Sequence, residues 1–208
     1  MTERRVRAYV GLGANLGESD AMLAHAIAAL AALPGVRLGG VSRLFATAPV
    51  GLTDQPEFRN AVVTLDVPAG PDASSGALAL LAQLKELERA FGRQPRPRWG
   101  PRELDLDLLI FGRARLAVDR TPHGRSVDAG IDPAKDSKLL EVPHPGAAAR
   151  LFVLAPLADL VPGLVPPGWG ASVETARRRQ AALEGPDAVR PIAAWDVATR
   201  TWRPTQPR

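Results

Sequence analysis

The sequence contains no cysteine, which excludes disulfide bonds and thiolate metal sites. Lysine is almost absent too, since Lys85, Lys135 and Lys138 are the only ones and arginine carries nearly all of the basic charge. No apolar run approaches the roughly 20 residues that a membrane span needs. The N-terminal segment also lacks the basic-then-apolar pattern of a secretion signal. These absences predict a cytoplasmic protein with no membrane partner.

The composition that is present is that of an ordinary soluble globular protein. The chain has 208 residues, of which 46% are hydrophobic and 23% charged, enough for one domain with a substantial core. A net charge of +4 suits polyanionic ligands, whether nucleotides or nucleic acid, and does not choose between them.

Apolar periodicity predicts the order of the elements. Strands are expected at 6–12, within 36–47, at 59–67 and at 103–111. A helix from about Leu23 to Leu33 separates the first two, and a second from about Leu78 to Phe91 separates the last two. The order β-α-β-β-α-β predicts an α+β fold, a ferredoxin-like sandwich with helices packed on an antiparallel sheet.

The remaining segments are less regular. Residues 113–141 are interpreted as a long surface loop, and 151–160 as a strand or a short helix. One helical stretch is expected at 173–183. We therefore predict one domain over residues 1–165 and a C-terminal extension over 166–208, packed on that domain.

One strand contains two aspartates in otherwise apolar surroundings. Alternate residues of a strand share a face, so Asp105 and Asp107 project together, with Cα atoms roughly 6–7 Å apart. Two carboxylates at this spacing can reach one metal ion or two, and oxygen ligands suit Mg²⁺ on nucleotide phosphates. The alternative is an exposed face with two solvated acids, although Asp is disfavoured in strands. The residues then expected to face the core are Leu104, Leu106, Leu108 and Ile110.

An arginine-rich loop precedes this strand. Within Gly92 to Arg102, Gly and Pro residues predict a loop, and guanidinium groups beside carboxylates supply what holding a Mg²⁺–triphosphate requires. Trp99 adds a flat surface for stacking a ring. The alternative is a solvated loop. The arginines are Arg93, Arg96, Arg98 and Arg102.

Two other features are weaker signals. The loop from Gly11 to Gly17 fails the dinucleotide fingerprint, because Leu16 occupies the third glycine position, and it lacks the Lys of a P-loop. We interpret it as a tight strand-to-helix turn whose Asn15 could still face a ligand. His144 is held between two prolines, a stiff arrangement that favours a site role.

Together these segments resemble one family, in its order, over about residues 8–160. Tyr9 to Gly17 is similar to its "ALGSNLG" start, and Thr47 to Ala61 to "TxPxGxxDQPxFxNAV". The run from Phe91 to Asp107 resembles "GRxRxxRWGPRxLDLDLL", and Val142 to Leu157 resembles "PHPxxxxRxFVLxPL". The family is that of hydroxymethyldihydropterin pyrophosphokinases. The arginine loop is one residue shorter here than in some members, and the stretch at 119–141 is longer than the compact family pattern.

The resemblance implies transfer of the β,γ-diphosphate of ATP to the hydroxymethyl group of 6-hydroxymethyl-7,8-dihydropterin, releasing AMP, in folate synthesis. It implies two Mg²⁺ ions held by Asp105 and Asp107, with Arg93 and Arg102 also catalytic. The residues expected at ATP are Glu88, Arg93, Arg96, Arg98, Arg102, His144 and Arg150. Those expected at the pterin are Thr47, Val50, Phe58, Asn60, Trp99 and Phe152.

Two other classes of function stay open from the sequence. A ferredoxin-like RNA-binding module would use arginines and aromatics, but such modules place aromatics on the sheet face, where Asp105 and Asp107 are expected here. A nonenzymatic relative that binds pterin or nucleotide is the second alternative, and the intact Asp pair argues against it. We expect small-molecule partners and no nucleic acid.

Overall fold

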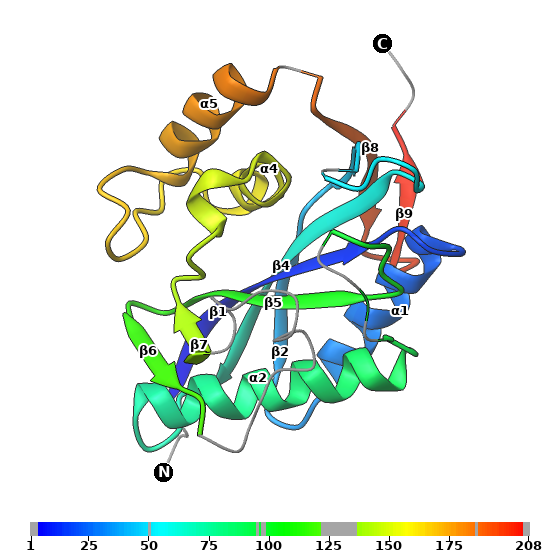
Figure 1. The fold of residues 1–208 in the computed structure, drawn as a ribbon. Coiled ribbons are helices and arrows are strands. Elements are labelled where there is room, and N and C mark those ends of the chain that lie inside the picture. The colour runs from blue at the N-terminus through cyan, green and yellow to red at the C-terminus, as the bar shows by residue number, and fades with distance from the viewer. Residues whose placement is uncertain are drawn as a thin grey trace.

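The computed structural model describes residues 4–49, 51–94, 96, 99–121, 137–185 and 187–205. They form a large antiparallel sheet with helices on both faces, and a separate two-stranded sheet (Figure 1). The elements of the first half are β1 (Arg5–Ala14), α1 (Ser19–Ala32), β2 (Arg37–Val41), β3 (Leu44–Thr47), β4 (Phe58–Pro68), α2 (Ala73–Ala90) and β5 (Asp105–Phe111). Those of the second half are β6 (Leu116–Asp119), β7 (Lys138–Val142), a 3₁₀ turn (Ala147–Ala149), α4 (Leu151–Leu160), α5 (Val173–Glu184), β8 (Val189–Asp196) and β9 (Thr201–Pro204).

The strand order confirms the predicted ferredoxin-like α+β fold. The large sheet runs β5-β1-β4-β3-β8-β9, and β2 also pairs with β4. The segment predicted as one strand at 36–47 is two strands, interrupted at Ser42. There the Ser42 backbone N–H donates to the Val62 carbonyl at 2.9 Å, and the Val62 N–H donates to the Ser42 hydroxyl at 2.9 Å. The side chain thus replaces a ladder bond, and both strands stay on β4.

Each face of the sheet buries its own apolar cluster. Helices α1 and α2 cover one face, where Leu23, Leu84 and Leu106 are fully buried. Helix α4 covers the other face, where Leu157 packs near Tyr9 and Val62. Because side chains of a strand alternate between faces, the residues of β5 that do not enter the α1–α2 core point toward the α4 side.

Ile110 was predicted to share a face with Leu106 and Leu108, but it lies on the opposite face of the sheet. Ile110 is buried, but it belongs to the cluster under α4, whereas Phe111 joins the cluster under α1 and α2. The cause is a β-bulge in β5: Tyr9 pairs with Ile110 but Val10 pairs with Leu108, so Leu109 is the extra residue. The bulge lies beyond the two aspartates, and the alternation around them is intact.

The C-terminal half contains strands that the sequence did not predict. The supposed surface loop at 113–141 begins and ends in β6 and β7, which pair with each other, while residues 122–136 lie outside the described part of the chain. Residues 151–160 form a helix rather than a strand, and the helix expected at 173–183 is α5. Strand β8 then pairs with β3 and extends the large sheet.

Candidate active site

Asp105 and Asp107 lie side by side on the α4 face of β5. They line a small cavity together with Asn60 and Phe152, over a floor formed by β1. Opposite them in the β1–β5 ladder stand Gly13 and Gly11. A Cβ atom added at Gly13 would lie 3.4 Å from the amide oxygen of Asn60. Gly13 therefore leaves space beside Asn60, whereas a Cβ atom added at Gly11 would meet the side chain of Leu109 at 3.4 Å.

The arginine at the start of the loop connects Asp105 to a buried acid. Arg93 Nη2 lies 3.0 Å from Asp105 Oδ1, and its Nη1 lies 3.1 Å from Oε2 of Glu88. Glu88 is only 1% exposed and accepts a further bond from the Leu106 backbone N–H at 2.7 Å. Lys85 Nζ donates to Glu88 Oε1 at 2.7 Å. The predicted Glu88 and Arg93 are thus brought together with Asp105.

The pKa values of Glu88 and Lys85 reflect both their burial and the charges around them. Burial raises the pKa of Glu88, and Lys85 and Arg93 oppose that rise. All three of its partners are donors, which suits a carboxylate that acts only as an acceptor. Burial by itself would lower the pKa of Lys85, but the charges of Glu88, Asp107 and Asp105 outweigh it and leave the pKa raised.

The other predicted arginines are placed differently. Arg96 is ion-paired with Glu103, at the beginning of the turn into β5. The backbone N–H of Arg102 donates to the side chain of Asn15 at 2.7 Å. Arg98 lies outside the described residues, so its predicted place at ATP has no structural counterpart here.

Asn15 ties three segments together instead of facing a ligand. It is 2% exposed, and besides Arg102 its side chain contacts the Gln55 amide oxygen at 3.0 Å and the Pro56 carbonyl at 3.1 Å. Gln55 in turn donates to the backbone carbonyl of Trp99 at 2.7 Å. The network therefore fixes the end of the arginine loop relative to the 51–56 segment, and the open reading of Asn15 as a ligand residue finds no support.

Two of the predicted pterin residues are in direct contact. The Asn60 amide donates to the Thr47 hydroxyl at 3.0 Å, and both residues are buried. Phe58 stands opposite Thr47 in the β3–β4 ladder. Val50 lies outside the described residues.

The two predicted stacking rings flank an arginine. The guanidinium carbon of Arg150 lies 6.0 Å from the ring centre of Trp99 and 5.9 Å from that of Phe152. Trp99 has a positive φ of 66° and is 37% exposed. Its side chain lies against Gly51, whose own φ is 82° and where an added Cβ would meet ring atoms of Trp99 at 3.0–3.1 Å. The guanidinium group of Arg150 is therefore near both rings that the sequence analysis assigned to the pterin.

His144 is held by the backbone around it. Its N–H donates to the Leu109 carbonyl at 2.8 Å, and its Nδ1 accepts the Gly146 N–H at 3.2 Å. His144 follows β7 in the chain, and its bond to Leu109 holds it near the C-terminal end of β5. The ring is thus oriented by the turn that leads into α4.

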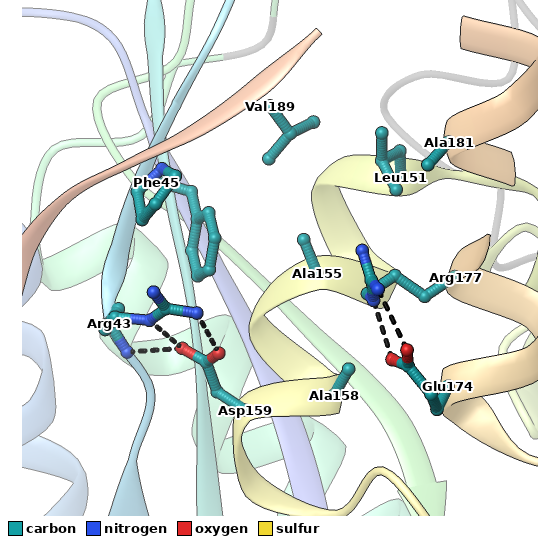
Figure 2. A pocket seen from close by; sticks show the side chains of 11 residues that line it. Arg43, Phe45, Leu151, Ala155, Ala158, Asp159, Glu174, Arg177, Ala181 and Val189 are labelled. Carbon is teal, nitrogen blue, oxygen red and sulfur yellow. Dashed lines mark hydrogen bonds and ion pairs between the residues drawn. The ribbon is translucent and has the colours of Figure 1, made fainter. Parts of the chain in front are cut away.

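A larger cavity lies elsewhere and contains none of the predicted site residues. It has a volume of about 440 Å³ and is located between β3 and β8 on one side and α4 and α5 on the other. Figure 2 shows Arg43 paired with Asp159 beside the ring of Phe45, and Arg177 paired with Glu174 on the α5 side of the cavity. Its four charged lining residues are paired with each other, Arg43 with Asp159 and Arg177 with Glu174. The size of a cavity alone therefore does not identify the predicted active site.

A comparison with protein-family models assigns the chain. The model described as 7,8-dihydro-6-hydroxymethylpterin-pyrophosphokinase (HPPK) matches residues 9–162, which include both aspartates and the arginine loop. The chain belongs to the HPPK family.

Curated HPPK relatives cover most of the chain. A 2-amino-4-hydroxy-6-hydroxymethyldihydropteridine pyrophosphokinase of Methylorubrum extorquens is 38% identical over 178 residues, which is 86% of this chain and 94% of that protein. One of the same name from Pseudomonas aeruginosa is 41% identical over 158 residues, covering 76% and 82%.

Solved structures share the HPPK fold at low identity. A Plasmodium falciparum HPPK-DHPS triple mutant with pteroate aligns over 100% of this chain with a TM-score of 0.69 and 12% identity. The chain spans half of that protein's length. Within the described residues, no helix is both long and apolar enough to cross a bilayer.

Sequence reasoning missed two residues that organise this candidate site. Lys85 was overlooked because a lysine on a helix usually faces solvent, and only the fold brings it to β5. Gln55 was part of a family motif, but its bond to Trp99 joins residues 44 positions apart. The sequence did contain a signal for Lys85. The buried stripe of α2 repeats at intervals of four, at Gly76, Leu80, Leu84 and Glu88. It therefore ends in a buried acid, which needs a cation.

Proposed function

We propose that the cavity around Asp105 and Asp107 is where this HPPK transfers the β,γ-diphosphate of ATP to the hydroxymethyl oxygen of 6-hydroxymethyl-7,8-dihydropterin, releasing AMP. The enzyme is an ATP-dependent diphosphotransferase of folate synthesis. The observation that carries the location is the pair of aspartates on one strand face, over glycines and beside Arg93.

The donor set fits Mg²⁺ bound mainly through the nucleotide. The described residues contain no group of three or more His, Cys, Asp and Glu side chains that could enclose a metal ion. Mg²⁺ commonly uses one or two carboxylates together with substrate phosphates and water. Asp105 and Asp107 supply those carboxylates, and Mg²⁺ bound there would neutralise charge on the triphosphate.

The acceptor pocket is proposed on the same face, between β4 and α4. Thr47 and Asn60 form a buried polar pair that offers a donor and an acceptor to the edge of a heterocycle. Trp99 and Phe152 would hold the flat ring between them, in the space where Arg150 now lies. Arg150, once displaced, would contact a phosphate of ATP.

The reaction follows from positioning and charge. The hydroxymethyl oxygen forms a bond to the β-phosphorus, the bond from that phosphorus to the α,β-bridging oxygen breaks, and this oxygen leaves with AMP. Arg93 and Arg102 would orient the triphosphate, and their guanidinium groups match its oxygens in forked geometry. The hydroxyl proton passes to water or phosphate, because we assign no general base.

The RNA-binding alternative is disfavoured by the same face of the sheet. RNA-recognition sheets stack bases on aromatic side chains, whereas this surface presents two carboxylates that repel phosphate without a cation. A binding protein without activity is separated from an enzyme by AMP release.

The decisive variant for the location is Asp107→Asn. It keeps the size of the side chain and removes the charge, so turnover should fall by a factor of roughly 10³ or more. The free energy of unfolding should stay within about 1 kcal/mol of the wild type. Asp119→Asn is the matched control, since Asp119 is an exposed acid of β6 paired with Lys138. Near-normal activity of Asp107→Asn would show that the carboxylate pair is not the metal site.

A further inference from the structure

The strand that bears the two aspartates, β5, is an edge strand of the large sheet. β5 pairs with β1 on one side, and no other described strand pairs with it on the other. Border strands present backbone N–H and C=O groups that need partners. Here, side chains of α2 provide them at Leu106, the residue between Asp105 and Asp107.

Two charged side chains hold Leu106 from the same side. Glu88 Oε1 accepts its N–H at 2.7 Å, and Lys85 Nζ donates to its carbonyl at 3.0 Å. The N–H belongs to the peptide group shared with Asp105, and the carbonyl belongs to the one shared with Asp107. The two bonds therefore fix both peptide planes from which the carboxylates project.

Lys85 also completes a chain of alternating charges. Its ammonium is 2.7 Å from Glu88, Glu88 is 3.1 Å from Arg93, and Arg93 is 3.0 Å from the carboxylate of Asp105. Removing Lys85 would leave Glu88, with a side chain only 2% exposed, compensated by Arg93 alone. Arg93 would then be drawn toward Glu88 and away from the triphosphate.

We propose that Lys85 is a positioning residue for diphosphate transfer. Through the Leu106 peptide groups and through Glu88, Lys85 sets the spacing and orientation of the Asp105 and Asp107 carboxylates. The inference rests on the proposed function only for its kinetic consequence. A displacement of a few tenths of an ångström at metal-binding carboxylates is enough to slow a reaction that depends on alignment.

The test compares Lys85→Met with Lys85→Gln, Lys85→Arg and a matched control. Lys85→Met keeps the apolar stem and removes the donor, Lys85→Gln keeps a neutral donor, and Lys85→Arg keeps the charge. Lys138→Met is the control, because it removes a lysine that pairs with Asp119 at 2.6 Å outside the site. The measurements are kcat, the KM of each substrate, the Mg²⁺ concentration for half-maximal rate, and hydrogen exchange at the Leu106 and Asp107 amides.

We expect Lys85→Met to lower kcat by about tenfold or more and to raise the Mg²⁺ requirement, with the pterin KM within about twofold of wild type. Exchange at the Leu106 amide should accelerate by about tenfold, because Glu88, which accepts the Leu106 N–H, loses its hydrogen bond from Lys85. Lys85→Arg should recover most of the rate and Lys85→Gln part of it. Lys138→Met should change none of these quantities.

Three results would overturn the proposal. One is a Lys85→Met enzyme with wild-type kcat and Mg²⁺ dependence. Another is a rise in the KM of ATP alone, which would make Lys85 a simple nucleotide contact. The third is unchanged exchange at Leu106. If Lys85→Met does not fold, Lys85→Gln carries the same comparison. A wild-type protein that forms no AMP would refute the proposed function, while the exchange experiment would still report on the Leu106 contacts.

Discussion

Arg93 is bonded to Asp105, with 3.0 Å between its Nη2 atom and the carboxylate Oδ1 atom. The same guanidinium group reaches the buried Glu88 at 3.1 Å. One predicted phosphate ligand is therefore pre-positioned by one predicted metal ligand. If the proposed site is right, we expect binding of a Mg²⁺–triphosphate to exchange part of this pairing for contacts with phosphate oxygens.

Replacing Arg93 should damage both stability and turnover. Arg93→Met removes a partner of a buried carboxylate and should cost about 2–3 kcal/mol in the free energy of unfolding. It should also lower kcat/KM for ATP by a factor of about 10². Urea unfolding and steady-state kinetics check the two effects. A destabilised variant with wild-type kinetics would limit Arg93 to a structural role.

Gly51 should be sensitive because of Trp99. Ala at this position would adopt an unfavourable φ of 82° and would meet the Trp99 ring at 3.0–3.1 Å. Gly17→Ala is a matched control, because its φ is 60° and an added Cβ meets nothing within 4 Å. Both variants should lose about 1 kcal/mol of stability from the backbone alone. Only Gly51→Ala should raise the pterin KM, and equal KM values in the two variants would contradict the placement of Trp99.

Trp99 itself should contribute to the pterin and little to ATP. Trp99→Ala removes one of the two stacking surfaces and should raise the pterin KM by about tenfold or more. Trp99→Phe retains a ring and should recover part of the loss. Substrate-saturation curves for both substrates measure this. An effect confined to the KM of ATP would place the nucleotide, rather than the pterin, against this ring.

Helix α5 should make stability depend on acid pH. Hydrogen bonds from Arg177 and then Arg178 lower the pKa of Glu174 to about 2. Because this pKa lies below its usual value near 4.5, the stabilisation is complete at neutral pH and is lost as the pH falls from about 5 toward 2. The difference in urea midpoint between wild type and Glu174→Gln should therefore shrink over that range. A constant difference down to pH 3 would contradict the assigned pairing.

The parts of the fold that the sequence predicted are those set by local alternation. Asp105 and Asp107 share a face because a strand has a period of two, whatever lies around it. Ile110 was assigned to the wrong face because a bulge depends on pairing with β1, which local pattern does not contain. Strand β8 was missed because Pro191 interrupts its pattern, and it is tolerated there beside an irregularity in the β3–β8 register.

The organisation of the site required tertiary structure for the same reason. Lys85 and Leu106 are 21 positions apart, and Asn15 and Arg102 are 87 apart. The sequence pointed to charged and polar groups of the right kinds. It did not indicate that Asn15 is used entirely within the protein, or that Arg96 is paired with Glu103.

The most direct test of the account is AMP formation from ATP by the purified protein. It is measured with and without 6-hydroxymethyl-7,8-dihydropterin, and with and without Mg²⁺, for wild type and Asp107→Asn. The account predicts AMP only when wild-type protein, pterin and Mg²⁺ are all present, with pterin diphosphate formed in equal amount. AMP formation without Mg²⁺, or equal rates for wild type and Asp107→Asn, would contradict it.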